Sequence, residues 1–246
     1  MGLTPYEMGT VPKESVDMNK AKPKNRSSWI MLFIKLIIGV LALPLTYGVT
    51  AAFYANFILI KELASSLNYF TWGIGSYVIL HLLFYKPTYL YVLGHESVHA
   101  GLAWVFGGKI KSFKVSPEGG SVGTDKSNFV IELGPYFIPI YAVIITIIYF
   151  VVASSYTINS VLFVFLIGFT LAMHMISTIE VMKIRQPDIV KSGYLFSIVT
   201  VYILNIVVIS FIFSLMFQTF SMHKFFIDLW GQSKFIYIAV YRQLFF

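Results

Sequence analysis

Gly94-His95-Glu96-Ser97-Val98-His99-Ala100-Gly101 is the stretch around which the rest of this chain is organised. Two histidines stand four residues apart, and a glutamate follows the first of them. On a helix such residues share one face, so both imidazoles can reach one tetrahedral zinc ion. Glu96 then lies close enough to take a proton from an attacking water molecule. The spacing predicts a catalytic Zn²⁺ site with His95 and His99 as ligands and Glu96 as the general base.

The motif lies inside an apolar segment, between Tyr89–Leu93 and Leu102–Phe106. Ionisable side chains inside a membrane segment are costly and usually mark a functional site. The alternative is a pair of buried histidines that bond to neighbouring groups and hold no metal. The apolar surroundings favour the metal.

The composition indicates a membrane protein with one membrane domain. Of 246 residues, 57% are hydrophobic and only 12% are charged, and the mean hydropathy of +0.77 lies far above that of soluble domains. The net charge of +7 lies mostly in short segments beside apolar runs, where Lys and Arg set the topology, so we expect no nucleic-acid partner. Because the chain has no Cys, zinc ligands must be His or carboxylate side chains.

The apolar runs predict an all-α, polytopic membrane protein with about five to six transmembrane helices. These runs are Trp29–Ile60, Tyr69–Tyr85, Pro87–Gly107, Phe129–Ala153, Asn159–Met182 and Tyr194–Gln218. Pro135 and Pro139 interrupt the fourth run, and the carbonyl groups that they free must find partners in the protein or in water.

Two different tails flank the membrane domain, which we place at residues 29–218. Residues 1–28 are polar, contain three prolines and end in a basic cluster. They predict a disordered cytoplasmic tail whose basic end meets anionic headgroups, and a solvated tail without function is the alternative. Residues 219–246 mix Phe, Trp and Tyr with Lys and Arg, which is typical of an interfacial segment.

A small, membrane-proximal β-hairpin is predicted directly after the motif helix. Polar and apolar residues alternate over Lys109–Val115, turn residues follow at Pro117–Gly120, and Ser121–Thr124 can form the return strand. The exposed edge of the first strand can pair with an unwound substrate segment. We assign substrate binding to Ser112, Phe113, Lys114 and Val115. The alternative is a structural loop at the headgroup level.

A third metal ligand must come from elsewhere, because no histidine follows His99 closely. The candidates are Asp188, Glu180, Glu132, His174, Glu118 and Asp125. We favour Asp188, which lies between two spans with Pro187 before it and Gly193 after it. A helix break lets a short side chain turn into a site. Glu180 is the second choice, although it also suits an ordinary ion pair with Lys183.

Several other polar residues stand inside apolar runs. His174, Ser177 and Thr178 share one helix face and predict a polar stripe that points to the bundle interior, either at the catalytic site or in interhelical hydrogen bonds. We interpret His81 as a hydrogen-bonded core residue. Glu132 is either a cavity residue or an interfacial one, and we favour the interfacial position. Accessory roles at the site are assigned to His174, Pro135 and Asn205.

In these motifs the chain resembles the site-2 protease family of intramembrane zinc metalloproteases. The similar segments are the motif helix His95–Ala103, its exit Phe106–Ile110, the strand and loop Lys114–Gly123, the pair Gly134-Pro135, and Gln186–Ile189, where the family carries its aspartate ligand. The resemblance covers Thr88 to Asn205. Isoleucine follows Asp188 where the family usually has glycine.

The resemblance implies cleavage of a membrane-spanning segment of another protein, usually a regulator or a signal-type remnant, near the cytoplasmic side. The partners are then a transmembrane substrate and the lipid bilayer, and the protein is a multi-pass protein of the cell membrane. The positive-inside rule places Lys109–Lys126 and Lys183–Lys191 in the cytoplasm, as it does the basic amino-terminal tail.

Two other functions compete with this interpretation. Membrane proteases that resemble the prenyl-protein zinc proteases use a glutamate as third ligand, which would be Glu180. A transporter or receptor that kept a metal site would work without Glu96 as a base. The signatures of serine and aspartate intramembrane proteases, Gly-x-Ser-Gly and Gly-x-Gly-Asp, are absent from the sequence.

Overall fold

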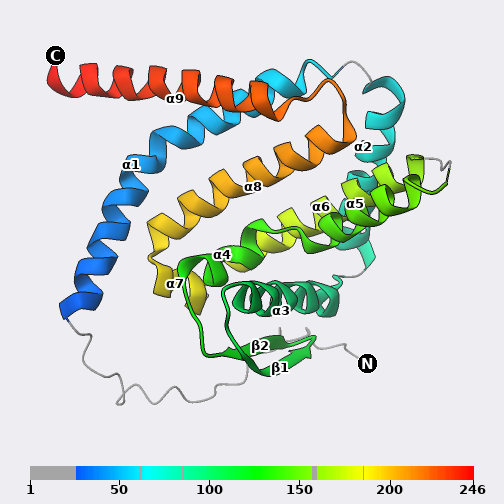
Figure 1. Ribbon diagram of the computed structural model, residues 1–246, viewed down its shortest axis with the longest axis horizontal. Coiled ribbons are helices and arrows are strands. Elements are labelled where there is room, and N and C mark those ends of the chain that lie inside the picture. The colour runs from blue at the N-terminus through cyan, green and yellow to red at the C-terminus, as the bar shows by residue number, and fades with distance from the viewer. Residues whose placement is uncertain (1–25, 61–62, 85, 157–159, 185) are drawn as a thin grey trace, which may run out of the picture.

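The structure is a computed structural model that describes residues 26–60, 63–84, 86–156, 160–184 and 186–246. Nearly all of the predicted cytoplasmic tail lies outside the described residues. The chain forms mostly helices and one hairpin (Figure 1). In order, the elements are α1 (Arg26–Phe57), α2 (Leu63–Ile79), the π-helical turn η2 (Leu80–Phe84), α3 (Thr88–Val105), β1 (Ile110–Ser116), β2 (Gly119–Thr124), α4 (Phe129–Phe137), α5 (Ile140–Ala153), α6 (Val161–Met182), α7 (Pro187–Ser192), α8 (Tyr194–Met216) and α9 (Met222–Phe245).

The described helices indicate a multi-pass membrane protein with fewer spans than expected. Three of them, α1, α6 and α8, are long and apolar enough to cross a membrane, and α4 with α5 makes a fourth span if the bent pair counts as one. The expected number was about five to six. The count leaves out α2, whose 17 residues continue directly into η2, and α3, which carries the charged and polar residues of the zinc motif.

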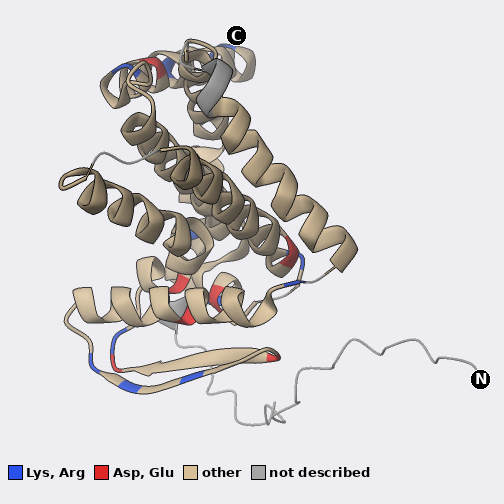
Figure 2. Ribbon diagram, turned by 90° about the vertical axis from the view of Figure 1, so that its right-hand side faces the viewer, with Lys and Arg blue, Asp and Glu red and all other residues tan. Residues whose placement is uncertain are grey.

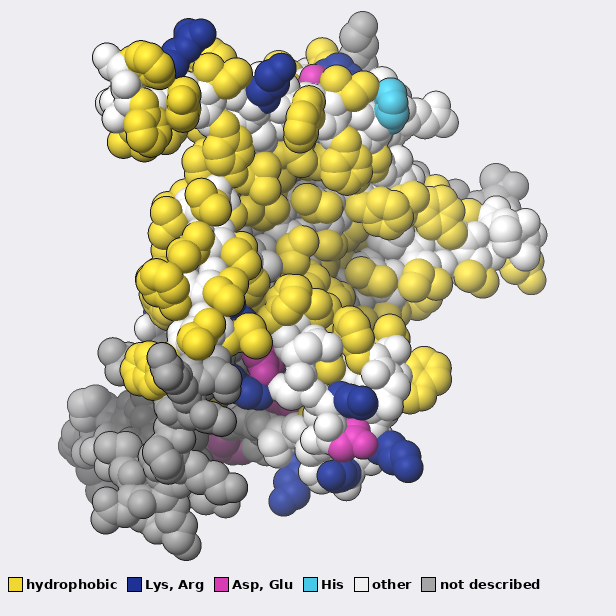
Figure 3. All heavy atoms as spheres, turned by 60° about the vertical axis from the view of Figure 1, so that its left-hand side comes forward, with side chains coloured by type: hydrophobic (Ala, Val, Ile, Leu, Met, Phe, Trp, Pro, Cys, Tyr) yellow, Lys and Arg dark blue, Asp and Glu magenta, His cyan; other side chains and the backbone are white. Residues whose placement is uncertain are grey.

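The charged residues gather at two ends of the molecule. In Figure 2 they lie along α9 and around α3, the hairpin and the adjoining helix ends, while the long helices between are almost free of them. Figure 3 shows hydrophobic side chains over the middle of one face and Lys, Arg, Asp, Glu and His at its two ends. This distribution suits a bilayer around the middle of the molecule, with the predicted zinc motif toward one polar end.

Helices α2 and α6 pack with their backbones in close contact. A Cβ added to Gly73 of α2 would lie 2.1 Å from the Phe165 carbonyl oxygen, and one added to Gly168 of α6 would lie 2.3 Å from the Phe70 carbonyl oxygen. Such small residues let membrane helices approach closely without a hydrophobic driving force. Beside them lies an aromatic and aliphatic core that includes Phe70, Ile167, Phe213, Phe220 and Phe225.

Helix α9 covers the second half of α1 and runs antiparallel to it. The Tyr237 hydroxyl donates to the Leu41 carbonyl at 2.5 Å, and the Asn56 amide donates to the Asp228 carboxylate at 2.9 Å. The segment predicted as an interfacial tail is therefore a helix packed on the bundle. Its place at the membrane interface stays a prediction.

The interruption predicted at Pro135 and Pro139 is a sharp bend. Helices α4 and α5 meet at 72°, and Pro139 has no N–H for the carbonyl four residues before it. Asn205 of α8 satisfies the neighbouring carbonyl, donating to the Tyr136 oxygen at 2.8 Å. The protein itself thus supplies the partner that an irregular backbone in a membrane needs.

The predicted hairpin is confirmed. Strands β1 and β2 are antiparallel and pair from Ile110 with Thr124 to Ser116 with Gly119. The turn is shorter than expected, because Gly119 and Gly120 belong to β2. Gly119 has a φ of 152°, which a residue with a side chain rarely adopts. Both strands pack against α3 (Figure 1).

Candidate metal centre

The structure brings the three predicted ligands together from two distant elements. His95 and His99 lie one turn apart on α3, with ring centroids 4.9 Å apart at 74°. Asp188 comes from α7, and its Oδ2 lies 3.5 Å from Nε2 of His99. Ligand atoms of the three residues all lie within 4.8 Å of one another, so the group can hold a metal ion.

The ligand chemistry fits zinc. Two histidines and one carboxylate, with a free fourth position, are a known set for catalytic Zn²⁺. The Asp188 carboxyl is suited to binding a cation: burial raises its pKa, but the hydrogen bond to His99 and the charges of His99, His95 and Lys191 outweigh burial and hold the pKa below its usual value. The carboxylate is therefore ionised at neutral pH.

Each histidine ring has a partner for its other nitrogen. Nδ1 of His99 lies 2.8 Å from the Ile131 carbonyl, which can only accept, so this nitrogen carries the proton and Nε2 faces Asp188. Nδ1 of His95 lies 3.4 Å from the Tyr91 hydroxyl. Such partners fix the orientation of metal-binding rings.

Glu96 lies against the hairpin. Its side chain is buried, with 6% of the residue exposed. A Cβ added to Gly120 of β2 would lie 2.5 Å from Cγ and 2.9 Å from Oε1 of Glu96. The absence of a side chain at Gly120 thus lets β2 pass directly over the predicted base.

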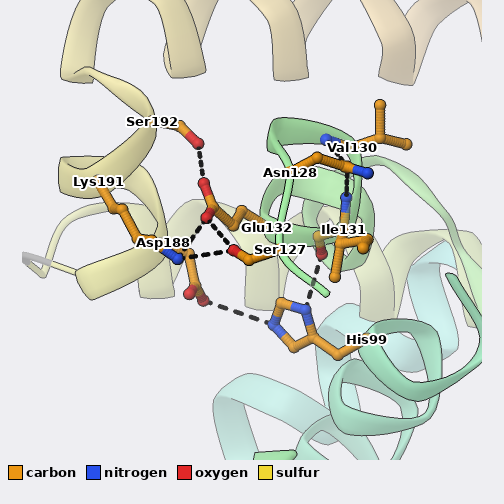
Figure 4. A network of polar contacts seen from close by, with 9 residues as sticks. All are labelled: His99, Ser127, Asn128, Val130, Ile131, Glu132, Asp188, Lys191 and Ser192. Atoms are coloured by element: carbon orange, nitrogen blue, oxygen red, sulfur yellow. Dashed lines mark hydrogen bonds and ion pairs between the residues drawn. The ribbon is translucent and has the colours of Figure 1, made fainter. Parts of the chain in front are cut away.

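Figure 4 shows a network of polar contacts that fixes α7, the helix that carries Asp188. Glu132 of α4 lies at its centre. Its Oε2 accepts from Ser192 at 2.5 Å, and its Oε1 accepts from Ser127 and pairs with Lys191, both at 2.6 Å. Glu132 is 7% exposed, so it is buried in the protein. Its position at the level of the membrane interface stays a prediction.

This network stabilises α7, which has six residues and is too short to be stable alone. Ile189 and Ser192 bury one face of α7, and Lys191 and Ser192 tie it to α4 through Glu132. Asp188 is thereby held opposite His99. Sequence reasoning missed this role, although a carboxylate inside an apolar run was the signal.

Glu132→Gln is expected to weaken zinc affinity by roughly 10–100-fold, the usual cost of losing a group that orients a ligand. The amide keeps the size of the side chain but loses the ion pair with Lys191. Zinc affinity is measured by competition with a chelating dye. Glu118→Gln is the control, because Glu118 lies in the exposed turn of the hairpin. An unchanged affinity in Glu132→Gln would show that α7 is held without this charge.

Glu180, the alternative third ligand, is engaged elsewhere. Its Oε1 lies 2.7 Å from Nζ of Lys86 and 3.1 Å from Nε2 of His81. The Tyr77 hydroxyl lies 3.1 Å from the other nitrogen of His81. His81 is therefore a hydrogen-bonded core residue, as expected, and Glu180 does not join the group of possible metal ligands within the described residues.

The residues with predicted accessory roles converge beside His95. Nε2 of His174 lies 3.1 Å from Oδ1 of Asn205, and a cavity of ≈ 20 Å³, enough for a water molecule, lies at the bend between α4 and α5. His95, His174 and Pro135 are among the residues that line it. Their catalytic role stays a prediction.

The fold and the site together define a multi-pass membrane protein with a candidate metal centre between α3 and α7. Comparison of the chain with protein-family models, with curated proteins and with solved structures gave no match. The function must therefore be argued from the site alone.

Proposed function

We propose that this protein is an intramembrane zinc endopeptidase that cleaves a membrane-spanning segment of another membrane protein. The observation that carries the proposal is the convergence of His95, His99 and Asp188 beside the buried Glu96, in a chain with several apolar helices. The resemblance to the site-2 protease family supports the same function. In this proposal the protein lies in the cell membrane with its site near the cytoplasmic face.

The chemistry follows from the residues. A bound zinc ion would polarise the peptide carbonyl and make water more acidic. His95, His99 and Asp188 would hold the ion. Glu96 takes a proton from water as the water oxygen bonds to the carbonyl carbon. The same proton passes to the amide nitrogen as the C–N bond breaks, so the products are one new carboxyl end and one new amino end.

The substrate must unwind before it is cut, because its amides are hydrogen-bonded within the helix. The hairpin offers a place for the unwound segment. Ser112, Phe113 and Lys114 of β1 are exposed, and β2 contacts Glu96 at Gly120. A backbone-paired segment would tolerate varied side chains.

Removal of the metal tests the proposed function directly. The probes are membrane-spanning peptides that carry a fluorophore and a quencher, reconstituted in vesicles with the purified protein. We expect a zinc chelator to stop cleavage and added Zn²⁺ to restore it, because Glu96 alone cannot activate water sufficiently. Cleavage that continues in protein shown by elemental analysis to be free of metal would contradict the proposal.

Phe113→Pro is expected to slow cleavage by roughly three- to tenfold and to leave zinc content unchanged. Phe113 pairs with Val122 at a position without ladder hydrogen bonds, so its N–H faces the free edge of β1. Proline removes that N–H, and one hydrogen bond is worth about this much. Phe113→Ala is the matched control, since it removes the same side chain and keeps the N–H. If proline at each of Ser112 to Val115 leaves the rate unchanged, the hairpin is a connecting loop and the substrate is held elsewhere.

A further inference from the structure

Tyr136 carries a buried hydroxyl that makes no hydrogen bond of good geometry with the described residues, although the Asp188 carboxylate lies close enough to act on it as an acceptor. The residue is 0% exposed. Its backbone carbonyl accepts a hydrogen bond from Asn205. Such a buried hydroxyl costs free energy in the folded state, and a catalytic role is one of the recognised reasons for keeping it in a native protein.

The position of Tyr136 suggests that reason. Its ring packs edge-on against the ring of His95, with centroids 5.1 Å apart at 87°. Among the neighbouring charges, that of Asp188 acts most strongly on the hydroxyl, and Glu96 also acts on it. The side chain of Tyr136 therefore lies beside the candidate metal centre, next to His95 and Asp188. Asn205 holds the backbone at this point.

We propose that Tyr136 is a catalytic residue whose hydroxyl donates a hydrogen bond to the carbonyl oxygen of the peptide bond that is cut. This inference rests on the proposed function. As water adds to the carbonyl carbon, the carbonyl electrons move to the oxygen, and the hydrogen bond to that oxygen strengthens. Tyr136 keeps its proton throughout. A preformed donor in a dry site stabilises this charge more than water does.

Tyr136→Phe removes the hydroxyl and keeps the ring. We expect kcat to fall by roughly 10²–10³-fold, as for other donors of this kind, with KM and zinc content little changed. We also expect the melting temperature of the metal-free protein not to fall, because the lost hydroxyl makes no hydrogen bond of good geometry. Tyr202→Phe is the control: the Tyr202 hydroxyl is 2.7 Å from Oγ1 of Thr50 in α1, so its loss should lower the melting temperature and leave kcat unchanged.

Three outcomes would overturn the inference. A kcat within about twofold of wild type would do so, because a lost oxyanion donor costs far more. Loss of zinc in Tyr136→Phe would mean that the hydroxyl orients Asp188. A lower melting temperature of metal-free Tyr136→Phe would mean that the hydroxyl has a structural partner.

A binding measurement separates failure of this inference from failure of the proposed function. The probe is a peptide phosphinate, whose tetrahedral, charged oxygen imitates the carbonyl oxygen during attack. Tyr136→Phe in the zinc-loaded form should bind it at least about tenfold more weakly than wild type, as expected for a lost hydrogen bond to a charged group. Equal affinity, or no affinity in either protein, overturns the role of Tyr136 whatever the cleavage assay gives. Absence of cleavage by wild type overturns the proposed function.

Discussion

Glu96→Gln is expected to retain zinc and to lose peptide cleavage by roughly 10²–10⁴-fold, the contribution of a general base. Glutamine has nearly the same size as glutamate but cannot take the proton from water. The ligand atoms of His95, His99 and Asp188 are untouched by the change. The fold should also be kept, because the buried side chain still fills the space beneath Gly120.

The experiment compares zinc content and cleavage of membrane-spanning peptides in wild type and Glu96→Gln. Glu118→Gln serves as the control, since it makes the same chemical change in the exposed turn of the hairpin. A Glu96→Gln protein that cleaves at the wild-type rate would contradict the proposal that Glu96 is the general base of a zinc peptidase. A metal-binding transporter or receptor would then be the better description.

Asp188→Ala is expected to remove most of the zinc, as are His95→Ala and His99→Ala. Each change deletes one of three ligands, so the loss in affinity should exceed the ~10–100-fold that a residue orienting a ligand contributes. Glu180→Ala should keep its zinc, because Glu180 is bonded to Lys86 and His81. The measurement is metal content after purification, together with zinc affinity by competition.

Full zinc occupancy in Asp188→Ala, with loss in Glu180→Ala, would contradict this assignment. It would move the chain to the membrane proteases that use a glutamate as third ligand. Melting temperatures measured beside the zinc content show whether a variant lost its metal by unfolding.

Local patterns predicted the hairpin and the helix break well. Alternation over Lys109–Val115 needs only neighbouring residues, and β1 covers nearly the same residues, Ile110–Ser116. Pro139 separates α4 from α5, because proline lacks the N–H that a helix needs, whereas Pro135 lies inside α4. The number of spans was predicted less well. Helix α3 is not among the candidate spans, because the histidines and the glutamate of its motif lower the hydropathy of an otherwise apolar run.

The sequence by itself determined that this is a membrane protein, and that His95, Glu96 and His99 lie close together on one helix. The first follows from composition, and the second from helix geometry over a single turn. Only the tertiary structure decided that Asp188 lies opposite His99 while Glu180 does not, and that Glu132 anchors α7. It also decided that the Tyr136 hydroxyl is buried beside the site without a hydrogen bond of good geometry. These contacts join helices that are distant in the chain, and packing rather than local periodicity selects them.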